Sequence, residues 1–311
     1  VQTPVSTGFN SKFINAGEIE NKGIEVVANG TPVKSGAFSW NVTVNWAKNT
    51  NTVIALTEGI DNLLLYSQWS TAINARVGQP YGTITGTDYV YTNGQKTVGT
   101  DGKYLATTSS TEIIGNLTPD WIGGIQNSFS FKGVSLGFLI DVQKGGDVLN
   151  YDWAFGNATG IYATTAGLNE LGNPVRDPVA DGGGVLLEGV QEDGSPNTIR
   201  AEAGDFTTPF GYYGGSGGFA AYAPDAQNVF DASYVKLREV TINYSLPTSL
   251  FANTPVANAS LGVYGRNLWI IHKNLPYGDP EYNTSSGNIR GIQNAAMPAV
   301  KEFGFNVKVQ F

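Results

Sequence analysis

The feature that most constrains this chain is a strict alternation of apolar and polar residues over strand-length segments. Across 38–46, every second residue is Phe, Trp or Val, and the residues between them are Ser, Asn or Thr. The segment 303–311 repeats this alternation, and so does 133–142, with Leu139 as the one exception. A period of two places apolar residues on one face of a β-strand and polar residues on the other. The sequence therefore predicts an all-β protein whose strands have two chemically different faces.

Composition indicates which way the apolar face points. Charged residues make up 14% of the 311 residues, against about 25% in a typical soluble domain. The mean hydropathy of −0.13 and the absence of an apolar run of about 18 residues argue against a helical membrane protein. Low charge with abundant Gly and aromatic residues fits a barrel that turns its apolar face to lipid and its polar face to the lumen.

Two further counts exclude other classes. The formal net charge of −8 argues against nucleic-acid binding, which needs a basic surface to replace counterions. The chain has no cysteine, which removes disulfides, thiolate metal sites and a cysteine nucleophile.

Nine strands are predicted, and they are joined by connections of unequal length. The expected strands cover 20–33, 37–56, 80–91, 103–114, 121–132, 133–144, 233–247, 258–271 and 300–311. Short turns are expected at 34–36, 132–133 and 247–258, and long connections at 57–79, 145–232 and 272–299. Bacterial outer-membrane barrels show this asymmetry, with short periplasmic turns and long extracellular loops.

The strand count and one irregular strand give two more expectations. Single-chain bacterial barrels have even numbers of strands, so nine predicts that further strands lie upstream of this chain. In 234–246 the apolar residues change face between Leu237 and Val240. A β-bulge near Arg238 and Glu239 would restore the phase, and the alternative is that this strand extends above the membrane.

Five short motifs then give the chain a family resemblance. Its segments are NKGIE at 21–25, LTPDW at 117–121, SYVKLREVTINYSLP at 233–247, GRNLW at 265–269 and GDPE at 278–281. In this order they resemble the "NRGIE", "TPD", "YxKLRxVxxxYxLP", "GRNLW" and "DPE" elements of SusC/RagA-type TonB-dependent transporters. The ending at 303–311 also resembles the terminal strand of that family.

The resemblance implies a transmembrane antiparallel β-barrel of 22 strands, of which this chain would supply the last nine. It implies an outer-membrane location, a plug domain and TonB-contacting segment in an absent N-terminal portion, and a SusD-like surface lipoprotein as partner. Family members often form dimers of the transporter–lipoprotein pair. The motif residues Arg266, Asn267, Asp279, Pro280 and Glu281 are expected to have structural roles.

The long 145–232 connection is where most of the acidic charge is found. It contains twelve acidic and two basic residues, a net charge of −10. Its aromatic residues are candidates for contact with a substrate or a partner, because aromatic rings offer large contact areas at little entropic cost. These candidates are Tyr151, Trp153, Phe155, Tyr212, Tyr213 and Tyr222. The alternative is that such rings form the small core of the connection itself.

The remaining candidate residues have limited chemistry. His272 is the only histidine, and without a second His or any Cys it predicts neither catalysis nor a transition-metal site. The segment 191–194 lacks the spacing of a calcium loop. Phe311, an aromatic residue that ends an alternating strand, resembles the signal read by the outer-membrane assembly machinery. No cofactor is expected.

The function predicted from the sequence is active import of a large nutrient, a glycan or an oligopeptide, and no enzymatic activity is expected. Two alternatives remain open at this point. A passive porin would also be a barrel but would need no plug. A secreted β-sandwich adhesin or glycan-binding module would instead turn its apolar faces into a core.

Overall fold

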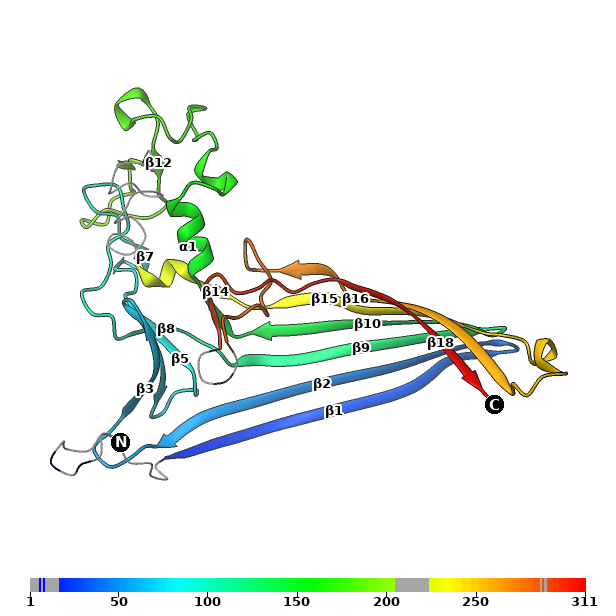
Figure 1. Cartoon of the computed structure of the whole chain (residues 1–311). Helices are drawn as coiled ribbons and strands as arrows, with labels where there is room; N and C mark the ends of the chain where they lie inside the picture. Colours follow the sequence, from blue (N-terminus) through cyan, green and yellow to red (C-terminus); the bar gives the residue numbers. More distant parts are fainter. Residues whose placement is uncertain (1–5, 7, 9–16, 205–223, 286, 288–289) are drawn as a thin grey trace.

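The main body of the protein is one antiparallel sheet of seven strands, seen in a computed structural model that describes residues 6, 8, 17–204, 224–285, 287 and 290–311 (Figure 1). In spatial order its strands are β1 (Glu18–Ser35), β2 (Phe38–Ala55), β9 (Pro119–Phe131), β10 (Val134–Gly145), β15 (Tyr234–Ser245), β16 (Asn258–Lys273) and β18 (Glu302–Gln310). Each strand pairs with its neighbours in antiparallel register. We refer to this sheet as the wall.

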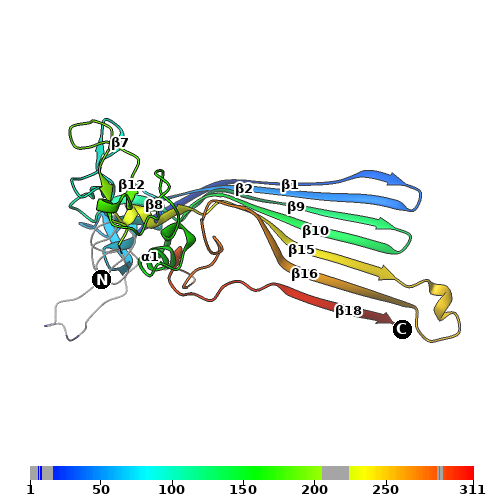
Figure 2. The same cartoon turned by 90° about the horizontal axis from the view of Figure 1, so that it is seen from above.

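All short connections of the wall lie at one end and all long ones at the other, as Figures 1 and 2 show. The turn between β9 and β10 contains only Lys132 and Gly133, whose φ angles are 47° and 85°. Two consecutive positive φ angles are typical of a type I′ hairpin turn, whose twist matches that of the strands it joins. The long connections cover 56–118, 146–233 and 274–301, and the predicted asymmetry is confirmed.

The long connections contain short elements of their own. Four strands form a second sheet: β3 (Asn62–Gln68), β4 (Thr71–Arg76), β5 (Thr83–Gly86) and β8 (Glu112–Asn116). A third sheet joins β14 (Val229–Asp231), β11 (Asp147–Asn150) and β17 (Ile292–Gln293). Two small hairpins are β6 (Tyr91–Thr92) with β7 (Gln95–Lys96), and β12 (Val185–Leu186) with β13 (Arg200–Ala201).

In the described residues, helical structure is confined to short segments. Helix α1 covers Tyr151–Ala158, and the 3-10 turns cover Ala163–Thr165, Val179–Asp181, Asp225–Asn228 and Thr248–Phe251. Within the described part of the chain, no helix combines the length and the apolar character needed to cross a membrane.

Two predicted wall strands are wrong. The segments 80–91 and 103–114 contribute β5 and part of β8, which belong to the second sheet, and the first residue of β6. Strand β2 pairs directly with β9. The expected loop 57–79 is likewise part of a longer structured connection that contains β3 and β4. Strand β5 has four residues, whereas a strand that crosses a bilayer needs about 9–11. Seven of the nine predicted strands are therefore wall strands.

The register of the wall confirms the two predicted faces. Leu136 pairs with Ile242, Ile242 with Val263, and Val263 with Phe305. Residues that lie opposite one another share a face, so apolar side chains form continuous rows across several strands. Between 38% and 80% of each of these four residues is exposed. Among the described residues no second sheet covers this face, which contradicts the β-sandwich alternative.

The irregular strand contains the predicted bulge. Leu139 pairs with Glu239 but Ile140 pairs with Leu237, so Arg238 is an extra residue in β15. The bulge returns Leu237 to the apolar face beside Ile140, whereas Glu239 lies on the opposite face. The prediction of a bulge at this position is confirmed.

One buried polar side chain interrupts the apolar face. Asn127 pairs with Val42 and Phe138, and only 7% of it is exposed. Its Oδ1 accepts a hydrogen bond of 3.0 Å from the indole N–H of Trp40, whose ring also stacks on Phe129. The tryptophan therefore both covers the amide and satisfies it, as a buried polar group requires.

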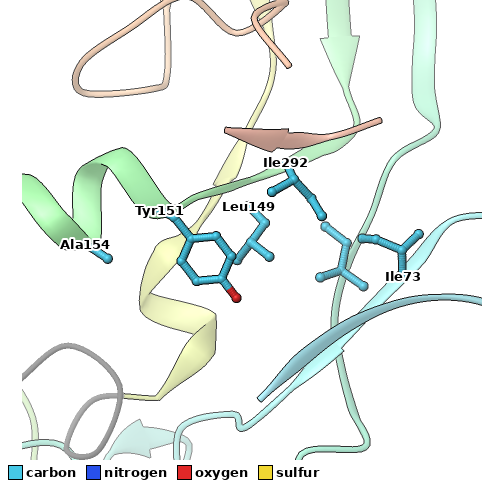
Figure 3. Close-up of a cluster of buried hydrophobic side chains, with 6 residues drawn as sticks. Ile73, Leu149, Tyr151, Ala154 and Ile292 are labelled. Carbon is cyan, nitrogen blue, oxygen red and sulfur yellow. The ribbon is translucent and has the colours of Figure 1, made fainter. Parts of the chain in front are cut away.

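The three long connections share one hydrophobic core (Figure 3). Ile73 and Ile84 come from the first connection, Leu149 and Tyr151 from the second, and Ile292 from the third; none is more than 3% exposed. Asp225 adds polar links, because its carboxylate accepts hydrogen bonds from Ser70 and Thr87 of the first connection at 2.7–2.9 Å. The connections therefore form a packed unit at one end of the wall.

Candidate functional site

Two of the sequence motifs, those at 233–247 and 278–281, meet in a network of charged side chains where β15 meets the third connection. Lys236 donates to both Asp279 and Glu281, the latter at 2.5 Å. The guanidinium of Arg238 donates to Glu281 at 2.6 Å and to Asp141 at 2.9 Å. We call these five residues the ion network.

Burial makes the ion network depend on its own pairing. Only 1% of the Lys236 side chain is exposed, and a buried charge is tolerated only when it is paired and hydrogen-bonded. Burial alone would raise the pKa of Glu281, but the hydrogen bonds and charges of Arg238 and Lys236 outweigh burial and hold this pKa at about 2. Tyr234 adds a hydrogen bond of 2.9 Å to Glu281. The network therefore fastens the third connection to the wall.

Arg266 and Asn267 lie on β16, opposite the bulge of β15. The Arg266 guanidinium donates to Glu239 at 2.8 Å and lies 3.9 Å from Glu302, which come from the two flanking strands. Asn267 has a φ of 51°, a left-handed conformation that Asn tolerates better than most residues. Its side chain donates to the carbonyl of Val300 at 3.2 Å. Arg266 thus links the two flanking strands, whereas Asn267 links β16 to the end of the third connection.

The structure divides the aromatic candidates of the second connection. Tyr151 belongs to the shared core, only 3% of it is exposed, and burial raises its pKa to about 12 against the opposing hydrogen bond with Thr71. Phe155 packs against the same core. Both follow the alternative in which the rings form the core of the connection. Tyr212, Tyr213 and Tyr222 lie outside the described residues.

Trp153 is part of an aromatic stack that the sequence did not predict. Its ring stacks on Tyr162 with the centroids 5.6 Å apart, and Tyr162 stacks on Tyr277 at 4.1 Å. Tyr277 belongs to the third connection, so nothing in the local sequence links it to the other two rings. The only signal was that Tyr277 directly precedes the GDPE motif.

A cavity of about 180 Å³ lies beside this stack, between the second and third connections. Its walls include four aromatic or proline side chains and two carboxylates: Tyr162, Tyr277, Tyr282, Pro298, Asp152 and Asp279. Two other cavities, of about 270 and 340 Å³, both include Pro119 and Arg290 in their linings. Amide side chains of Asn21, Asn49 and Asn51 on the polar face line the larger one. The polar face and the connections thus offer open, hydrogen-bonding surface.

The remaining candidates lie apart from these cavities. Phe311 follows β18 at the short-turn end and is 83% exposed. The ring of His272 contacts Asn274 at 3.1 Å. Within the described part of the chain, no group of three or more His, Asp or Glu residues is arranged to hold a metal ion.

Comparison with known proteins decides among the architectures that this sheet could belong to. The chain is 26% identical to TonB-dependent receptor P3 of Formosa agariphila, in an alignment that covers 99% of the chain and 30% of that receptor. It is also 26% identical to TonB-dependent receptor P26 of the same organism over 95% of the chain. Over 63 residues it is 36% identical to TonB-dependent receptor SusC of Bacteroides thetaiotaomicron.

Solved structures give the same answer for the fold. The whole chain superposes on 31% of a chain in the structure of the RagAB peptide transporter, with a TM-score of 0.64 and 21% identity. The resemblance to SusC/RagA-type TonB-dependent receptors is confirmed. No family model matches the chain. The wall therefore has the fold of a segment of a transmembrane β-barrel, similar to that of these receptors. The chain spans about 30% of the length of the curated relatives it matches.

Proposed function

We propose that this chain is the C-terminal barrel portion of an outer-membrane transporter that imports a large nutrient. The observation that carries the proposal is the asymmetry of the wall, which has short turns at one end and a packed unit of three connections at the other. In bacterial outer-membrane barrels the long loops are extracellular. The connections, including 145–232, then face the outside and the apolar face of the wall contacts lipid.

The partners follow from the receptors that the chain resembles. A SusD-like lipoprotein would cover the extracellular connections, and TonB would supply energy through a plug-bearing region outside this chain. The protein would provide a pathway and a binding surface rather than covalent chemistry. Trp153 and the acidic residues of the second connection are proposed to contact substrate or the lipoprotein. A dimer of the transporter–lipoprotein pair is also part of the proposal.

The cargo would be a glycan or an oligopeptide. Both are polymers that fit the polar face of the wall, where Asn21 accepts hydrogen bonds from Asn49 and Asn51 at 3.1 and 2.8 Å. Amide groups of this kind can bind hydroxyl groups and peptide groups alike.

The experiment that tests this function has two parts. Native mass spectrometry of the complex, purified from outer membranes in mild detergent, should find a polypeptide about three times the length of this chain, bound to a lipoprotein. Uptake of labelled oligopeptides or oligosaccharides should then require TonB. A passive porin would instead give uptake that persists without TonB, and a free, detergent-independent polypeptide of 33.0 kDa would refute the membrane function altogether.

A further inference from the structure

The 180 Å³ cavity beside the aromatic stack contains one carboxylate that is not neutralised. Asp279 is paired with Lys236. Asp152 forms no ion pair with any residue that the structure describes. Its Oδ1 accepts from the backbone N–H of Ala295 at 2.7 Å, and its Oδ2 accepts from the hydroxyl of Tyr282 at 3.2 Å.

Local structure fixes the position of this carboxylate. Asp152 is in the first turn of α1, whose N-cap Asn150 accepts a hydrogen bond of 2.8 Å from the N–H of Trp153. The two donors to Asp152 come from the third connection, so the carboxylate links α1 to that connection. An ionised carboxylate can accept about four hydrogen bonds, so two neutral donors leave capacity for a further donor.

The walls of the cavity suit a particular shape of ligand. Tyr162 and Tyr277 are stacked on one another with an interplanar angle of 5°, and together with Pro298 they contribute apolar carbon to the lining of the cavity. The amide of Gln293, 1% exposed, donates to the carbonyl of Asp279 and is already engaged. A group with many hydroxyls would find few free partners here. An aliphatic stem that ends in a cation would match both the rings and the carboxylate.

We infer that this cavity binds a basic side chain, Lys or Arg, of an imported oligopeptide, with Asp152 as the counter-ion. The inference rests on the proposed import function and names a substrate class for it. The surrounding connection is strongly acidic, with twelve acidic and two basic residues in 145–232, which attracts cationic peptides before they reach the cavity. A divalent metal is a poorer match, since calcium takes six to eight oxygen ligands.

The test uses the full-length transporter with its lipoprotein, purified in detergent. The probe is a mixture of N-terminally acetylated random octapeptides, offered with its lysines free or acetylated, and bound peptides are counted by mass spectrometry. Binding by the unaltered protein should favour free lysine by about tenfold, the value of one charge-assisted contact. The Asp152→Asn variant should lose this preference. Asp177→Asn removes the same charge from an exposed position of the same connection, outside the cavity, and should keep it.

Three outcomes would overturn the inference. Equal binding of free and acetylated peptides by the unaltered protein would show that no cation is recognised. A uniform loss of both forms in Asp152→Asn would mean that the carboxylate only holds α1 against the third connection. Preference for glucosamine oligomers over lysine peptides would assign the cavity to amino sugars. TonB-dependent uptake is measured separately, so failure of import is distinguished from failure of this binding preference.

Discussion

The wall and the connections solve the same problem, where to place apolar side chains, in opposite ways. In the wall, Ile24 and Val26 are 65% and 49% exposed, and nothing among the described residues covers their face. In the connections, Ile73 and Ile84 are fully buried in a core shared by three segments. A surface that faces lipid needs no protein behind it, whereas one that faces water must bury its apolar groups. The two regions should therefore respond differently to the same kind of substitution.

The largest expected effect is at the ion network, where the two regions are joined. Lys236→Met leaves Asp279 without its cation, and breaking a buried ion pair from one side costs about 3–5 kcal/mol. We expect the third connection to detach while the wall stays paired. Hydrogen exchange of the full-length protein should rise in 274–285 and stay low in β9 and β10. Equal loss of protection in both regions would contradict this separation.

The second prediction concerns the two faces of the wall at one depth. Ile125 lies on the apolar face between Val44 and Ile140, and Gln126 lies on the polar face between Thr43 and Leu139. Ile125→Arg should lower the free energy of unfolding in lipid by about 2–4 kcal/mol, the cost of Arg near the middle of the membrane. Gln126→Arg, one residue away, should cost much less. Similar costs for both variants would refute the assignment of the faces.

The third prediction concerns the polar residue within the apolar face. Trp40→Phe keeps an aromatic ring beside Phe129 but removes the indole N–H that donates a hydrogen bond to Asn127. An unsatisfied buried amide oxygen costs about 1–3 kcal/mol. Trp46→Phe is the matched control, because Trp46 lies on the same face and strand, away from Asn127. Chemical unfolding in lipid vesicles measures both variants, and equal destabilisation would show that lost ring area, not the hydrogen bond, determines the effect.

The sequence predicted the wall well because its signal is local. Alternation within one segment identifies a half-buried strand, and the phase change near Arg238 located the bulge without knowledge of its partner. The connections gave no such signal. All four residues of β5 are buried, so its sequence shows no alternation between a buried and an exposed face. The position of the neighbouring short strands depends on packing with distant segments.

The site was less predictable than the fold for the same reason. Lys236 and Asp279 are 43 residues apart, and their motifs suggested structural roles without linking them. The stack that contains Trp153 includes Tyr277 from another connection. The aromatic composition of the second connection alone could not show that Tyr151 is buried in the core while Trp153 belongs to the stack. Tertiary contacts between the three connections supply what the local pattern lacks.

The smallest expected effect is the response of the ion network to acid, because Glu281 keeps 36% of its side chain exposed and solvent weakens its interactions. Its pKa of about 2 in the folded protein lies below the usual value of 4.5. A carboxylate whose pKa is lowered by folding contributes stability that is fully present above about pH 4.5 and is lost as the pH falls towards about 2. Hydrogen exchange in 274–285, corrected for intrinsic rates, should therefore increase over this range. In Glu281→Gln the increase should be smaller, since Gln has no proton to gain. An unchanged acid response in this variant would assign the pH dependence to other carboxylates.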